Sequence, residues 1–275
     1  MSTVQAQQLG VPANTRLSPY FEKCCLNVSA NASYQRAEED LRLLTGICIS
    51  RSTLQRLTQR REWPEPELLE PIEELSLDGG MVRLRTPQGQ ACEWREYKAL
   101  AVHEQMNIAF YKENEKLVNW VNDQPLSIPF VCLGDGHDGV WNLADRMGEA
   151  AHRIEILDWY HLMENASKVQ APADVLAAVR EMLWNGETRD AIRYLRGHRC
   201  PGATGFINYL HRHSTRIINY KAWQEEGRSI GSGQVESLVK QIASRLKLNG
   251  AQWSAKSVPK ILKHRCAYLN GKLAA

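Results

Sequence analysis

The sequence has no apolar run near the roughly 18 residues of a membrane-spanning helix, and its start, MSTVQAQQLG, lacks the apolar centre of a signal peptide. It also lacks a disulfide framework. Its seven cysteines are an odd number without regular spacing, and Cys24 and Cys25 are adjacent. Such cysteines are typical of buried thiols in a reducing compartment. These absences argue against a membrane or secreted protein and predict a cytoplasmic one.

A large net charge is absent too, since 34 Lys and Arg stand against 31 Asp and Glu. The charge is nevertheless uneven. Residues 227–275 hold nine Lys and Arg against one acid, Glu236, so this stretch carries about +8 and the rest of the chain about −5. A basic block on an acidic body favours a polyanionic partner. A solvated basic helix pair without any partner explains the same charge distribution.

The first part of the chain reads as a loose leader, residues 1–19, followed by a helical region, residues 20–62. In SYQRAEEDLRLLTG, the residues Tyr34, Ala37, Leu41 and Leu44 fall on one helix face, and Gly46 ends the run. A short turn and a second helix, STLQRLTQRR, complete the outline of a helix-turn-helix. Arg51, Arg56 and Arg60 of that second helix are the candidate DNA contacts. Many helical hairpins bind nothing, so the spacing alone leaves this open.

A stiff acidic, proline-rich linker, residues 63–71, separates this region from a second domain, residues 72–275. IEELSLDGG, MVRLRT and EWREYKALAV read as three strands, and PFVCLGDG and HRIEILDWY as two more, with helices between them. This β-β-β-α-β-α-β order predicts an α/β fold with a ribonuclease H-like mixed sheet and flanking helices. Residues of about 162–226 read as a helical insertion before the last helix pair.

Two aspartates follow apolar strands and have glycine neighbours. Asp78 precedes Gly79-Gly80, and Asp135 lies between Gly134 and Gly136. If these strands are adjacent, the two carboxylates repel each other, and a divalent cation is the usual means of keeping both ionised. Oxygen ligands of this kind point to Mg²⁺ or Mn²⁺. Glycine beside each aspartate would leave room for a substrate backbone, although single Asp-Gly pairs are usually only turns.

Glu236 is the third candidate ligand. At 100° per residue, Lys240 and Lys247 share its face of the predicted helix, whereas Leu238, Ile242 and Leu246 lie on another. A helix with this arrangement would present a metal ligand while its lysines follow a phosphate backbone. A solvated amphipathic helix that binds no ligand would have the same distribution of residues around its axis.

The strings LSLDGG, CLGDGHDGVWN, ILDWYHL, IGSGQVES and LKHRCAYLNG resemble those of ISKra-type insertion-sequence transposases, relatives of the Mutator-like DDE enzymes. The resemblance extends over about residues 18–271. It implies a ribonuclease H-like fold, a helical insertion before the final acid, and DNA cleavage with strand transfer. The catalytic triad of that family falls on Asp78, Asp135 and Glu236, and its Asp-x-x-His motif on Asp158 and His161. A homodimer that pairs two DNA ends is implied by the resemblance alone.

The expected chemistry is phosphodiester cleavage and joining on double-stranded DNA by two Mg²⁺ or Mn²⁺ ions held by the three acids. Lys240, Lys247 and His161 are candidates to stabilise charge on the phosphate. Several features are set aside in this interpretation. Asp138 and His137 are weaker ligand candidates than Asp135. Trp159 is a candidate for stacking on a base. Four further residues could be imagined as zinc ligands, but their spacing is not that of a usual zinc site: His198, Cys200, His211 and His213.

Three other functions stay open from the sequence. A truncated or catalytically silent transposase relative would bind DNA ends without cutting them. A structure-selective nuclease on the same fold would nick DNA and never join it. A glycoside hydrolase with paired carboxylates explains neither the basic tail nor the helix-turn-helix.

Overall fold

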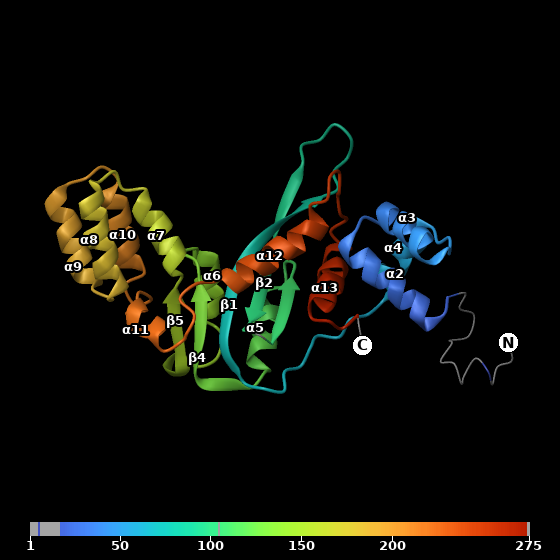
Figure 1. Cartoon of the computed structure of the whole chain (residues 1–275), viewed down its shortest axis with the longest axis horizontal. Helices are drawn as coiled ribbons and strands as arrows, with labels where there is room; N and C mark the ends of the chain where they lie inside the picture. The colour runs from blue at the N-terminus through green and yellow to red at the C-terminus, as the bar shows by residue number, and fades with distance from the viewer. Residues whose placement is uncertain (1–4, 6–16, 104, 274–275) are drawn as a thin grey trace.

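The computed structural model describes residue 5 and residues 17–103 and 105–273, with a mixed five-stranded sheet at the centre (Figure 1). The strands are β1 (Ile72–Leu84), β2 (Glu93–Val102), β3 (Met106–Phe110), β4 (Leu126–Gly134) and β5 (Arg153–Leu157). Their order is β3-β2-β1-β4-β5. The pairs β1–β2 and β2–β3 are antiparallel, whereas β4 and β5 continue the sheet in parallel from β1. The predicted α/β class with a mixed sheet is therefore confirmed.

The division of the first strands was predicted wrongly. IEELSLDGG and MVRLRT form one strand, β1, because the pairing with β2 runs unbroken from Leu75 to Leu84 through both glycines. Glycine keeps its backbone donor and acceptor, so a glycine pair weakens a strand without ending it. The third strand is the short Met106–Phe110 segment, which the prediction missed.

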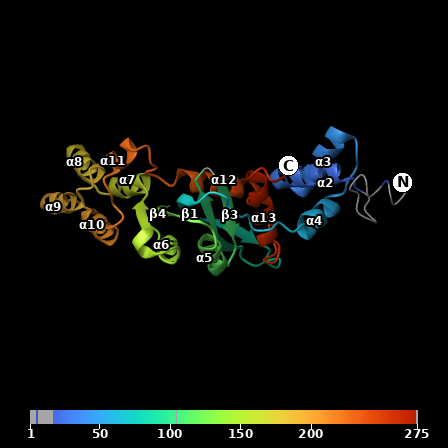
Figure 2. The ribbon, with the colours of Figure 1, turned by 90° about the horizontal axis from the view of Figure 1, so that it is seen from below.

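Both faces of the sheet are covered by helices (Figure 2). The residues of β1 alternate between two cores. Leu75 and Leu77 pack with α5 (Asn114–Asn122) and α6 (Asp138–Ala144), whereas Val82 and Leu84 pack with α12 (Gly233–Leu246) and α13 (Val258–Leu269). This alternation follows from the two-residue repeat of a strand and places a separate apolar layer on each face.

The N-terminal region is a cluster of three helices, α2 (Pro19–Asn31), α3 (Tyr34–Thr45) and α4 (Arg51–Arg60). A serine side chain caps the start of each helix, at positions 18, 33 and 50. Leu41 is buried as expected, but Leu44 is 74% exposed because the helix ends at Gly46 and no element packs on its last turn. The predicted leader lies mostly outside the described residues, and Pro19 already belongs to α2.

The three N-terminal helices pack on the C-terminal pair. Arg265 of α13 donates to the Ala30 carbonyl (3.1 Å) and Asn31 Oδ1 (2.6 Å), and Arg245 of α12 donates to the Ser29 carbonyl (2.8 Å). Both arginines are buried. Two cations of the basic block thus bind the protein's own backbone, which weakens the charge argument for a polyanionic partner.

The acidic linker between α4 and β1 pairs with the same basic block. Lys260 Nζ lies 2.8 Å from Glu62 Oε1, and Lys263 Nζ lies 3.0 Å from Glu65 Oε1. The Trp120 indole also donates to the Pro66 carbonyl at 2.8 Å. Part of the uneven charge along the chain is therefore balanced within the molecule.

The segment predicted to be helical between 162 and 226 is helical and lies beyond β5 at one end of the molecule (Figure 1). A 3₁₀ turn, Ala150–His152, precedes β5. The helices are α7 (Trp159–Ser167), α8 (Ala173–Trp184), α9 (Thr188–His198), α10 (Ala203–Arg212) and α11 (Tyr220–Glu225). Among the described residues, none of the helices combines the length and the apolar character that a membrane crossing requires.

Candidate functional site

Three aspartates lie side by side at one end of the parallel strands: Asp78 in β1, Asp135 directly after β4 and Asp158 directly after β5. Leu77 pairs with Gly134, and Gly134 pairs with Leu157, so the next residue on each strand is Asp78, Asp135 and Asp158 respectively. Residues in one row of parallel strands project to the same face. Asp78 does not end its strand, as the prediction had it, because β1 continues to Leu84 with β2 as its partner. It lies where the parallel pairing with β4 stops.

Glu236 comes from the first turn of α12, which packs on β1 above this row. Burial raises the pKa of the Asp78 carboxyl, and the negative charges of Asp135 and Glu236 raise it further. A hydrogen bond from the Gly79 N–H (2.6 Å) and the charge of His161 act in the opposite direction. The three predicted ligands therefore act on one another electrostatically across the end of the sheet.

Asp158 is fully buried and holds the neighbouring elements together. Its Oδ1 accepts from the His161 N–H (2.8 Å), and its Oδ2 accepts from the Ser232 N–H and from the Ser232 hydroxyl (2.7 Å). It thereby caps α7 and fixes the loop that leads into α12. Burial opposes ionisation of Asp158, but the hydrogen bonds from His161 and Ser232 outweigh it and hold its pKa at about 2.

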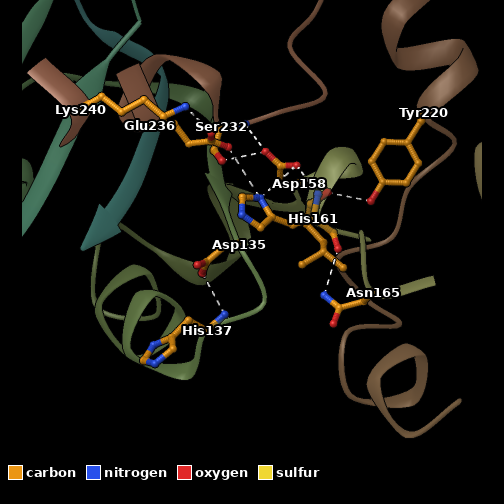
Figure 3. Close-up of polar contacts among 10 residues, drawn as sticks. Asp135, His137, Asp158, His161, Asn165, Tyr220, Ser232, Glu236 and Lys240 are labelled. Carbon is orange, nitrogen blue, oxygen red and sulfur yellow. Dashed lines mark hydrogen bonds and ion pairs between the residues drawn. The ribbon is translucent and has the colours of Figure 1, made fainter. Parts of the chain in front are cut away.

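The His161 ring lies between Glu236 and Asp135 (Figure 3). Its Nδ1 is 3.4 Å from Asp158 Oδ1 and 3.8 Å from Glu236 Oε1. Contact with Asp158 raises the pKa of His161 to about 9 against its desolvation, and the charges of Asp135 and Glu236 add to the increase. His161 is thus a cation at neutral pH, within a cluster of four acids.

One group of potential metal ligands is compact among the described residues. One ligand atom each of Asp158, His161 and Glu236 lies within 4.8 Å of the others. Asp78 and Asp135 are not part of this group. Burial raises the pKa of Asp78, and the negative charges of Asp135 and Glu236 add to that increase, so a cation beside these groups would favour the ionised carboxylate. The donor set of carboxylates fits a hard divalent cation, and His161 occupies part of the space between them.

The two predicted lysines differ in position. Lys240 Nζ lies 3.5 Å from Glu236 Oε2, one helical turn further along α12. Lys247 follows the last residue of α12, about 16 Å along the axis from Glu236 by helix geometry, and its ammonium lies over the Trp94 ring at 5.8 Å. Lys240 therefore belongs to the site, whereas Lys247 lies at the far end of the helix.

The glycines beside the aspartates do not leave open space. A Cβ atom at Gly80 would lie 2.1 Å from the Tyr97 ring, and one at Gly136 would lie 2.4 Å from the Tyr209 hydroxyl. At Gly79, directly beside Asp78, the nearest atoms belong to the side chains of Glu96 and Lys98. Side chains of the protein thus lie against these glycines, and the access of a substrate backbone to them stays a prediction. The sequence interpretation missed Tyr209 of α10. The only signal of it in the sequence is the small residue at position 136, which leaves space for the Tyr209 ring.

Ser232 was missed as well. Its two donations to Asp158 couple the start of α12 to the row of aspartates. Its signal in the sequence is the Gly-Ser-Gly run before α12, which reads equally well as an ordinary loop.

The alternatives that the sequence interpretation set aside have other roles. Asp138 forms an ion pair with Arg212, which ties α10 to the first residue of α6, and His137 Nδ1 accepts from the Gly139 N–H at 3.1 Å. In the part of the chain that the structure describes, the histidines and cysteine set aside as a zinc site form no compact group of three potential ligands. His198 instead binds the Tyr194 carbonyl, and His211 contacts Arg196. Trp159 is only 4% exposed, so its expected role as a stacking surface is contradicted.

The three arginines of α4 are exposed, but they are not equally available. Arg60 pairs with Glu22 at 3.2 Å, and Arg56 folds back to the Ser52 carbonyl at 3.3 Å. The described contacts of Arg51 involve its backbone N–H, which donates to Glu38. These arginines are far from the acid cluster, at the opposite end of the sheet from the helical insertion (Figure 1).

Comparison with known proteins gives no relative: no protein-family model matches the chain, and no curated protein matches it.

Proposed function

We propose that this protein is a DNA transposase that cleaves and joins phosphodiester bonds with divalent metal ions at Asp78, Asp135 and Glu236. The observation that carries the proposal is the row of aspartates at the ends of the parallel pairing, one in β1, one directly after β4 and one directly after β5, with Glu236 of α12 beside it. His161 and Lys240 offset part of the negative charge of these acids, and a bound metal cation would offset the remainder. The resemblance of the motifs around these residues to insertion-sequence transposases supports the same assignment.

The strand order supports a ribonuclease H-like core. Three antiparallel strands continue into two parallel ones, with the candidate acids in the central strand β1, directly after its neighbour β4 and on a late helix. In this proposal α3 and α4 form a helix-turn-helix that binds the element's ends, and two copies of the chain hold the two ends together. Exposed Arg51, Arg56 and Arg60 on α4 suit contact with DNA.

The bound metal ions, Mg²⁺ or Mn²⁺, would activate the attacking oxygen and stabilise the leaving one. Asp78, Asp135 and Glu236 would hold them. Asp158, fixed by Ser232, orients His161, whose positive charge faces the phosphate. Lys240 offers a second cation beside Glu236. In the first step a water oxygen bonds to phosphorus, the P–O3′ bond breaks and O3′ takes a proton. The freed 3′-oxygen then bonds to a phosphorus of the target DNA, the P–O3′ bond of the target strand breaks, and the proton of the attacking hydroxyl passes to the released O3′.

The test is cleavage of a labelled duplex that spans the DNA flanking the gene, with Mg²⁺, Mn²⁺ or EDTA. We expect metal-dependent nicking at a defined boundary, and a loss of at least about 100-fold in Asp135→Asn, comparable to removing one group that stabilises a transition state. Asp123→Asn is the matched control, because this exposed aspartate caps α5 away from the site. Equal cutting by wild type and Asp135→Asn would overturn the assignment.

The same assay separates the two other DNA functions. Specific binding without cutting under any metal indicates an end-binding relative that has lost its activity. Nicking of branched DNA without joined products indicates a structure-selective nuclease.

A further inference from the structure

Lys98 of β2 is a buried cation that has no part in the proposed cleavage. It is 5% exposed, and its Nζ donates to Glu96 Oε1 at 2.7 Å. Among the described residues Glu96 is its one ion-pair partner, and the side chain of Glu96 is 49% exposed. A half-exposed carboxylate compensates only part of the free energy that burial of an ammonium costs. Because the ammonium has three N–H donors and Glu96 accepts from one of them, Lys98 can bind a further anion.

The strand register places Lys98 beside the first predicted metal ligand. Lys98 pairs with Gly79, the residue that follows Asp78. Leu100, two residues further along β2, belongs to the core on the side of α5 and α6, so Lys98 projects to that face of the sheet. Asp78 projects to the opposite face, where α12 lies. The cation and the carboxylate therefore approach neighbouring positions of β1 from the two faces of the sheet.

Two glycines make room for the Lys98 ammonium and its partner. A Cβ atom at Gly79 would lie 2.4 Å from Glu96 Oε1 and 3.4 Å from Lys98 Nζ. A Cβ atom at Gly139 would lie 3.4 Å from the same nitrogen. Gly79 directly follows the first predicted metal ligand, and Gly139 comes four residues after the second. The ammonium therefore lies where the segments that follow these two ligands meet.

We propose that Lys98 binds a DNA phosphate next to the one at the acid cluster, and that Glu96 occupies its ammonium until DNA binds. The half-exposed Glu96 carboxylate turns to solvent when the phosphate takes its place. The phosphate then accepts a charge-assisted hydrogen bond from the ammonium. This contact fixes the strand relative to the metal ions, and reaction rates depend strongly on such positioning. The inference rests on the proposed DNA chemistry and adds to it a phosphate-binding residue on β2.

The experiment removes the charge of one DNA phosphate at a time. The flanking duplex of the cleavage assay is prepared as a series, each member with a methylphosphonate at a different position, and fluorescence anisotropy in EDTA gives each dissociation constant without cleavage. We expect one position at which the substitution weakens binding of wild type by about tenfold, the size of one hydrogen bond to a charged group. Lys98→Met should bind the unmodified duplex about tenfold more weakly and lose the sensitivity at that position alone.

Glu96→Gln separates a phosphate contact from a structural ion pair. Loss of this carboxylate frees the Lys98 ammonium, so the variant should bind the unmodified duplex about threefold more tightly, the worth of a half-exposed ion pair. A purely structural pair would give weaker or unchanged binding in both variants. Lys116→Met is the matched control, because Lys116 of α5 also pairs with one glutamate, Glu113, and should leave every sensitivity as in wild type.

A set of phosphate sensitivities that is the same in wild type and Lys98→Met overturns the inference, and so does a Glu96→Gln protein that binds no more tightly than wild type. If circular dichroism shows that Lys98→Met does not fold, the result for Glu96→Gln decides alone. If metal-dependent cleavage occurs and no phosphate depends on Lys98, only the phosphate site is wrong. If wild type does not bind the duplex, the proposed function fails together with it.

Discussion

Asp158 and His161 have opposite responses to pH, and each sets one limit of the cluster's stability. The pKa of Asp158 is lowered to about 2 from 3.8, so its contribution is present above 3.8 and is lost as pH falls toward 2. The pKa of His161 is raised to about 9 from 6.5. Its contribution is complete below 6.5 and is lost as pH rises through 9. The contact is therefore strongest across the neutral range.

His161→Gln tests the alkaline limit. The difference in unfolding free energy between wild type and His161→Gln should shrink as pH rises from 6.5 through about 9, because deprotonation removes the charge that the variant already lacks. Urea denaturation in EDTA at several pH values measures it. His152→Gln, which removes a partly exposed histidine outside the acid cluster, is the matched control. A difference that stays constant to pH 10 would contradict the ion pair.

Asp78→Asn tests whether the row of acids is electrostatically crowded. Because burial and neighbouring negative charges raise the pKa of Asp78, its ionised form destabilises the fold at neutral pH, and the variant should melt at a higher temperature in EDTA. Added Mg²⁺ should raise the melting temperature of wild type more than that of Asp78→Asn. Thermal unfolding with and without Mg²⁺ checks both points. A variant that melts lower in EDTA would contradict the crowding.

At the scale of elements, α10 of the helical insertion packs tightly against the loop that follows β4. Gly136→Ala should lower the unfolding free energy by about 1–3 kcal/mol, because the new methyl group collides with the Tyr209 ring. Gly205→Ala in α10 is the control, since a Cβ atom there has no neighbour within 4 Å and the change should be neutral or slightly stabilising. Urea titration compares the two. Equal effects would mean that α10 is not packed on the loop after β4.

The N-terminal helices are joined to the C-terminal pair by buried arginines. Arg265 donates to Gln241, Ala30, Asn31 and Ser244 and has no carboxylate partner among the described residues. Arg265→Met should cost about 2 kcal/mol or more, because it leaves buried carbonyl groups unpaired. Faster amide exchange in α2 than in β4 would locate the loss. Exposed Lys256→Met is the control, and similar exchange in both variants would count against this role.

At the scale of the whole molecule, α4 with its exposed arginines lies beyond α13, whereas α12, with Glu236 in its first turn, begins on the side toward the helical insertion (Figure 1). A duplex that reached both would have to extend along the molecule. Arg56→Ala should weaken DNA binding and reduce the slope of log Kd against log salt by about 0.9, the value of one lost phosphate contact. Arg36→Ala is the control because Arg36 is engaged by Glu39 and Asp40 of its own helix. An unchanged slope in Arg56→Ala would exclude that contact.

Local pattern in the sequence determined much of the framework. Apolar alternation and helical periodicity gave the mixed α/β class, most of the helices and the helical segment after β5, because these depend on neighbours within a few residues. The same logic selected Asp78 and Asp135 as residues at the edge of apolar strands. The same reasoning was wrong in predicting that the two glycines divide β1, because the pairing with β2 continues through both of them.

Only the tertiary structure decided which of these residues meet. The strand register puts Asp158 in the same row as Asp78 and Asp135, and α12 brings Glu236 and Lys240 to that row while it carries Lys247 away. Tyr209 and Ser232 join the site through contacts between elements distant in the chain. Which cations of the basic block face solvent was also decided by the tertiary structure, because Arg245 and Arg265 turn inward to bind backbone carbonyls. A single sequence records which side chains are present, but their distances follow from packing that joins remote segments.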